Sequence, residues 1–179
     1  EKAYPNIVRQ GTRVVQKEKI TDILKRLVDE QVSIKDLKLI FECIGEKGQS
    51  VQDTVFLTEH IRQALKRHIT YKYSEGSSVL SVYHLDKDIE NMVRNATKRA
   101  SDGVYLELEP QDIELMKQAF RQNLRAPQTG GQKVIVLCDM MVRRFIAKLI
   151  HVDFPYVVVL SYQELDESVK VLPLADIKF

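Results

Sequence analysis

The sequence predicts an α+β protein in two parts. An all-helical subdomain covers residues 1–75, and a small α/β subdomain with a mixed sheet covers residues 76–179. In the first part, apolar residues recur every three or four positions, which is the period of an amphipathic helix. In the second part, apolar runs of strand length alternate with helical patterns, which is typical of a sheet joined by crossover helices. The small, polar segment 74–78 between them has the composition of a linker.

The first part is organised around two helices predicted between Lys17 and Ile44. Ser33 can cap the second helix, and Asp36 three residues later can complete a capping box. Because the turn between the helices is short, we expect them to fold back and bury their apolar stripes on each other. The stripes are Ile20, Ile23, Leu24, Leu27 and Val28 in the first helix, and Ile34, Leu37, Ile40, Phe41 and Ile44 in the second.

Two further helices flank this pair. Tyr4 and Pro5 begin a short helical piece that Gly11 and Thr12 weaken. Asp53 is a candidate N-cap for a helix through about Tyr71. Its predicted inward stripe is Leu57, Ile61, Ala64 and Leu65, with His68 or Ile69, and its opposite face carries Glu59, Arg62, Gln63, Lys66 and Arg67.

The second part reads as alternating strands and helices. Strands are predicted at 79–83, 104–108, 134–138, 157–160 and 169–172, and helices at 86–100, 110–124 and 139–150. The unbroken apolar runs at 134–138 and 157–160 are typical of strands that are buried on both faces. At least one parallel strand pair is therefore expected.

Composition narrows the classes of function. The chain has 179 residues, 44% of them hydrophobic, and a net charge of +2, which together favour a globular protein and give no argument for nucleic acid as a partner. Its apolar runs are all well short of the ~20 residues that a membrane-spanning helix needs. The sequence begins at Glu1 without an initiator Met, so we interpret it as a fragment of a longer protein.

Metal and cofactor sites have little support. The four histidines, at positions 60, 68, 84 and 151, do not cluster with cysteines or carboxylates at ligand spacing. Gly130 and Gly131 precede the strand at 134–138, whereas a phosphate-binding loop follows a strand and opens a helix. We therefore expect no metal and no cofactor.

One pattern suggests an enzyme. Cys138 and Arg144 have the Cys-x5-Arg spacing of cysteine phosphatases, at the end of a buried strand and the start of a helix. Such a position lowers the pKa of a thiol and favours phosphate. However, the loop has no glycine to bend its amides around a phosphate, and Asp139 would place a carboxylate beside it. We favour the alternative in which Cys138 is a buried apolar residue, Asp139 is an N-cap, and Arg143 and Arg144 are surface charges.

The other candidate site is a surface. Glu59, Arg62, Lys66 and Arg67 form a charged patch on the predicted third helix. A solvated face is the usual interpretation of such charges. The alternative is a protein contact, because arginine is enriched at interfaces.

Four stretches, in this order and at these separations, resemble one family. They are Tyr4-Pro5 with the helix that follows, LVDEQVSIKDL at 27–37, LTEHIRQAL at 57–65 and FPYVVVLSYQEL at 154–165. Together they resemble the C-terminal cytosolic part of the type III secretion export-gate proteins, which are flagellar FlhA and its injectisome (SctV-type) counterparts, with the injectisome branch closer. Residues 11–16 lack the Pro and Ser cap expected there, and residues 101–132 match only in pattern.

The resemblance implies a bacterial inner-membrane protein of which this chain is a cytoplasmic piece, the third and fourth of four cytosolic subdomains. It implies a homo-oligomeric ring, thought to be a nonamer, that docks chaperone–substrate complexes, the gatekeeper and the ATPase stalk protein for ordered export. It implies no catalysis. The lateral contact of such a ring would fall on the helical subdomain, and we assign it to Glu59, Arg62, Lys66 and Arg67.

Overall fold

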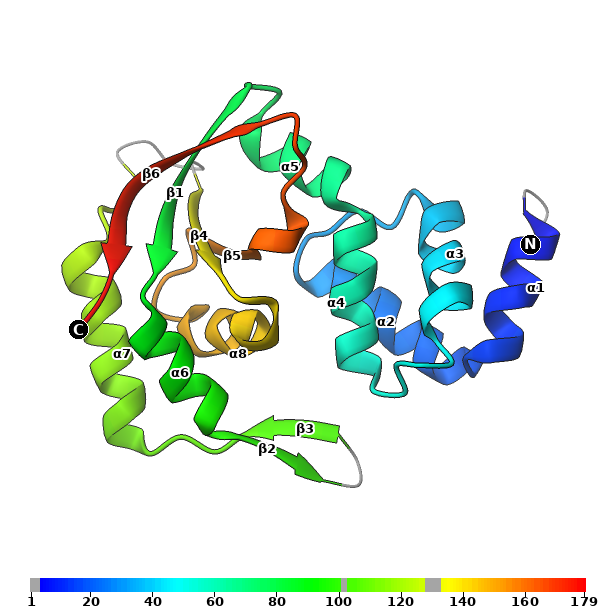
Figure 1. Ribbon diagram of the computed structural model, residues 1–179, viewed down its shortest axis with the longest axis horizontal. Helices are drawn as coiled ribbons and strands as arrows, with labels where there is room; N and C mark the ends of the chain where they lie inside the picture. Colours follow the sequence, from blue (N-terminus) through cyan, green and yellow to red (C-terminus); the bar gives the residue numbers. More distant parts are fainter. Residues whose placement is uncertain (1–3, 101–102, 128–132) are drawn as a thin grey trace. The chain divides into compact units, whose positions relative to one another are not determined.

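The computed structural model describes residues 4–100, 103–127 and 133–179, and the chain forms two compact units, Glu1–Thr70 and Tyr71–Phe179 (Figure 1). The division falls shortly before the boundary predicted at residues 75 and 76. It lies within helix α5 (Lys66–Ser74), which contributes residues to both units. The small polar segment that follows α5 therefore lies inside the second unit. Each unit is described by itself below.

The first unit contains helices α1 (Pro5–Val14), α2 (Lys17–Asp29), α3 (Leu37–Lys47) and α4 (Thr54–Ala64), and the start of α5. Residues 4–70 include no strand, as the period of the sequence predicted. Helix α4 packs against both α2 and α3, and α3 also packs against α1. The prediction that α2 and α3 bury their stripes on each other is therefore wrong, because the helix against which both of them pack is α4.

Several local predictions for this unit need correction. The N-cap of α3 is Asp36, whose carboxylate accepts the Leu39 N–H, so the capping box from Ser33 does not form. Val28 and Leu37, which the sequence placed in the two apolar stripes, are exposed. The long third helix is two helices, because Leu65 ends α4 with a non-helical ψ of 10°.

Helix α1 is continuous although Gly11 lies in its interior, and its packing against α3 explains why a glycine occupies this position. A Cβ added at Gly11 would lie 2.8 Å from Cδ1 of Phe41 on α3. The close approach of α1 and α3 therefore requires a residue without a side chain at this point. The low helix propensity of glycine destabilises α1, and the packing that Gly11 permits offsets this loss.

The second unit is built on a parallel sheet of four strands in the order β5-β4-β1-β6. The strands are β1 (Val79–Leu85), β4 (Val134–Cys138), β5 (Val157–Ser161) and β6 (Lys170–Ile177). Helices α6 (Lys87–Asn95), α7 (Pro110–Asn123) and α8 (Met140–Ile150) share one apolar core with the sheet residues Tyr83, Val136 and Val159. These three helices therefore cover one face of the sheet (Figure 1).

Antiparallel pairing lies in a separate two-stranded ribbon of β2 (Thr97–Ala100) and β3 (Gly103–Leu106). The α+β class is confirmed, and its parallel and antiparallel pairs divide between two sheets. Strand β2 occupies residues that the sequence assigned to the end of a helix over 86–100, which is wrong: α6 ends at Asn95, and β2 has β3 as its pairing partner. Gly130 and Gly131 lie outside the described residues.

Among the described residues, no helix has both the length and the apolar character needed to cross a bilayer.

Candidate functional site

The predicted interface on α4 is not the open face that the sequence suggested. Glu59 and Arg62 are each only 2% exposed. The Arg62 Nη1 donates to Glu30 Oε2 at 2.9 Å, across 32 positions of sequence. The outward placement of these two side chains is therefore wrong. The helical period of the sequence predicts that charged residues face solvent. A charged side chain can nevertheless be buried when a side chain of opposite charge from another element forms an ion pair with it.

Lys66 and Arg67 are the part of the predicted patch that remains on the surface. Both belong to α5, where Lys66 is half-buried and Arg67 is exposed. The next residue, His68, lies 3.2 Å from Asp36, measured from Nε2 to Oδ2. The pKa of Asp36 is held below its ordinary value, first by the N–H of Leu39 and then by His68. The accessible patch is thus Lys66 and Arg67 beside a histidine–aspartate pair.

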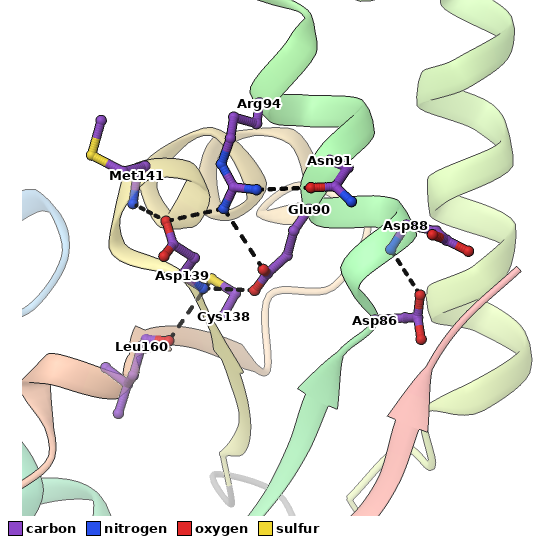
Figure 2. Close-up of polar contacts among 9 residues, drawn as sticks. All are labelled: Asp86, Asp88, Glu90, Asn91, Arg94, Cys138, Asp139, Met141 and Leu160. Atoms are coloured by element: carbon purple, nitrogen blue, oxygen red, sulfur yellow. Dashed lines mark hydrogen bonds and ion pairs between the residues drawn. The ribbon is translucent and has the colours of Figure 1, made fainter.

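The predicted thiol site lies at the carboxyl end of β4 (Figure 2). Cys138 is fully buried, and its Sγ is 3.9 Å from the carbonyl oxygen of Leu160. Asp139 caps α8 by accepting the Met141 N–H at 2.8 Å. The Glu90 Oε1 accepts the Asp139 N–H at 2.7 Å. Two carboxylates therefore occupy the helix N-terminus at which a phosphate would have to bind, as Figure 2 shows.

Arg94 completes this cluster. Its Nη2 is 3.4 Å from Asp139 Oδ1 and 3.9 Å from Glu90 Oε2, so one guanidinium serves both carboxylates (Figure 2). The pKa of Glu90 is raised, mainly by burial and also by the charge of Asp139, while the Asp139 N–H and Arg94 act in the opposite direction. The cluster joins α6 to the start of α8.

The two arginines after Cys138, Arg143 and Arg144, lie in different environments, and neither is a fully exposed surface charge. Arg143 is fully buried, with its Nε 3.8 Å from Glu164 Oε1 and its Nη1 3.4 Å from the Val159 carbonyl oxygen. Arg144 is half-buried and donates from Nη2 to the Val104 carbonyl at 2.9 Å, while its guanidinium lies over the Phe145 ring. The surface placement of Arg143 is thus wrong. Because Cys138 is buried and the carboxylates of Asp139 and Glu90 lie at the helix N-terminus, the geometry does not support the phosphatase alternative.

Sequence reasoning missed Glu90 and Glu164. Glu164 follows Ser161 by three positions, and its Oε2 accepts the Ser161 N–H at 2.9 Å. The Ser-x-x-Glu spacing was a usable signal for this role. Glu90 had no such signal, because its partners on α8 lie almost fifty positions away.

Across residues 4–100, 103–127 and 133–179, no group of three or more His, Cys, Asp and Glu side chains could hold a metal ion.

This combination of a helical unit and an α/β unit is shared with solved domains of secretion-system proteins. The fold matches Chlamydia pneumoniae CdsV, solved as a CdsV and CdsO protein complex, with a TM-score of 0.93 and 43% identity over 99% of this chain and 52% of that chain. It also matches the nonameric EscV cytosolic domain from the type III secretion system, with a TM-score of 0.84 and 34% identity over 100% of this chain and 53% of that chain.

The sequence gives the family. Residues 1–170 match the model of the FHIPEP family. The chain is 36% identical over 177 residues to the low calcium response locus protein D of Yersinia pestis, covering 99% of this chain and 25% of that protein. The chain therefore belongs to the FHIPEP family, and the resemblance to the type III secretion export gate is confirmed. It spans about a quarter of the length of this curated relative.

Proposed function

We propose that this chain is part of the cytosolic region of an injectisome export gate, anchored in the bacterial inner membrane, and that it works as a ring-forming docking module without catalytic activity. The observation that carries the proposal is the match, over the whole chain, to a cytosolic domain solved as a nonamer. Membership of the FHIPEP family supports it.

We propose further that the ring contact uses the exposed end of the predicted patch, Lys66 and Arg67. Both side chains carry positive charge and neither is buried, so an acidic surface on the next subunit would complement them. Arginine can also bind a carboxylate through two parallel hydrogen bonds, which fixes orientation as well as adding attraction. Glu59 and Arg62 are not part of this contact surface, because both are buried.

The test uses the complete cytosolic region that contains this chain. The double variant Lys66→Glu with Arg67→Glu should leave the fold intact, because neither side chain is buried and surface substitutions usually change stability by less than ~0.5 kcal/mol. It should reduce the fraction of rings seen by sedimentation velocity, and high salt should partly mimic it. A matched control is Arg13→Glu with Lys25→Glu, two exposed cations elsewhere in the same unit. Rings of unchanged abundance in the Lys66 and Arg67 variant would refute the contact.

The α/β unit is the proposed docking element for the stalk protein, the gatekeeper and chaperone–substrate complexes. The solved complex of CdsV with a second protein, CdsO, supports docking on a member of this fold. Pull-downs should compare the complete cytosolic region with the same protein lacking residues 76–179. Partner capture should fall in the truncated protein, and undiminished capture would move the docking site to another part of the protein.

A further inference from the structure

The β2–β3 ribbon is fixed to its unit by one face and leaves the other free. Strand partners in an antiparallel pair point to the same face. Val104 and Leu106 pack against the apolar core of the unit, and their partners across the ribbon are Arg99 and Thr97. The opposite face carries Lys98, with Tyr105 directly across from it and 48% exposed.

The two edges of the ribbon differ. On β3, the Val104 carbonyl accepts a hydrogen bond from Arg144 on α8 at 2.9 Å, so this edge is held against the unit. On β2, the described part of the chain offers no second strand, because the sheet consists of β2 and β3 alone. Figure 1 shows the ribbon set apart from the four-stranded sheet. An edge of this kind presents backbone N–H and C=O groups to which another extended segment can pair.

The free edge is basic. From Asn91 to Ala100 the chain has three cations and no carboxylate. Arg94 is engaged by Glu90 and Asp139. Lys98 and Arg99 are exposed, and within the described residues neither side chain has an ion pair or hydrogen bond. Because they are consecutive in a strand, they project to opposite faces of the ribbon and place positive charge on both sides of the open edge.

We propose that the open edge of β2 binds an extended acidic segment of a partner protein as a third strand of the ribbon. Main-chain hydrogen bonds would supply the pairing, and carboxylates on both faces of the segment would pair with Lys98 and Arg99. This surface is separate from the ring contact proposed above and is tested on the 179-residue chain alone, so the two proposals succeed or fail independently.

The probe is a short fluorescein-labelled peptide of valine and glutamate, with consecutive glutamates at its centre. Binding is followed by anisotropy and by the amide shifts of Thr97 to Ala100. Lys98→Glu with Arg99→Glu should weaken binding about tenfold, because two attractive pairs become repulsive. Arg13→Glu with Lys25→Glu, which changes the net charge equally, should leave the affinity within about twofold. A peptide N-methylated at alternate amides keeps its charge but loses its strand hydrogen bonds, and should bind about tenfold more weakly.

Three results would overturn the proposal. Equal binding of the N-methylated peptide would show attraction by charge without strand pairing. An equal loss of peptide affinity in the Arg13→Glu with Lys25→Glu control would show that binding depends on net charge alone. Absence of saturable binding, together with self-association of the Lys98→Thr and Arg99→Thr variant in sedimentation, would show that these cations only guard the edge against sheet aggregation.

Discussion

Each unit of this chain buries an arginine that its sequence pattern places at the surface, and the two sites differ in how the partner carboxylate is placed. In the helical unit, the Arg62 side chain is 2% exposed but its partner Glu30 is 35% exposed. In the α/β unit, Arg143 and Glu164 are both 0% exposed. Solvent therefore still reaches one member of the first pair and neither member of the second. Glu30 left without Arg62 can be hydrated, whereas Glu164 left without Arg143 cannot.

The largest difference should appear when each arginine is truncated. Arg143→Ala leaves Glu164 buried without its guanidinium and should cost about 3–5 kcal/mol in the free energy of unfolding. Arg62→Ala should cost about 2 kcal/mol, because Glu30 can turn to water. Urea denaturation of both variants is the measurement.

The double variant Arg143→Met with Glu164→Gln is the matched control for the buried pair. It removes both charges and should recover part of the loss seen in Arg143→Ala. Equal costs for Arg62→Ala and Arg143→Ala would contradict the claim that the exposure of the partner separates the two sites.

The apolar core of the helical unit gives a second comparison, between neighbouring residues of one helix. Leu27 is 0% exposed and Val28 is 52% exposed, although the sequence placed both in the same stripe. Leu27→Ala should cost ~2–5 kcal/mol, as large-to-small changes in a core do. Val28→Ala should stay within ~0.5 kcal/mol. Denaturant melts decide this, and a Leu27→Ala loss below ~1 kcal/mol would mean that α2 does not bury this face.

The smallest expected effect on stability comes from Glu90. Its folded-state pKa is raised above the ordinary value of 4.5, mainly by burial. Between the ordinary and the raised pKa, the folded protein holds more protons than the unfolded chain. The contribution of Glu90 to stability is therefore full below its ordinary pKa and is lost as the pH rises through the raised one. Glu90→Gln, which keeps an acceptor for the Asp139 N–H, should remove this decline.

The measurement is urea denaturation of wild type and Glu90→Gln at several pH values from 4 to 7. Relative to wild type, the variant should gain stability as the pH rises across this range. Asp88→Asn is the control, because Asp88 is an exposed carboxylate of the same helix. A difference between Glu90→Gln and wild type that does not change with pH would show that Glu90 keeps its ordinary pKa.

The sequence by itself determined the elements that depend on local pattern. The helices of residues 4–70, the alternation of strands and helices after residue 78, the caps by Asp53 and Asp139 and the buried environment of Cys138 all follow from period and composition. Each is decided within a few positions of chain, where the side-chain period and capping chemistry act. The family also followed from the sequence, through four ordered stretches.

Only the tertiary structure decided which charges are buried. Arg62 meets Glu30 just after the end of α2, Glu90 meets the backbone of Asp139, and Arg143 meets Glu164 in the segment after β5. These partners are separated by 21 to 49 positions in sequence. Strand β2 likewise forms where β3 can pair with it. A charge or a strand of this kind is stabilised by a group that the chain brings near only on folding, so the local pattern cannot specify it.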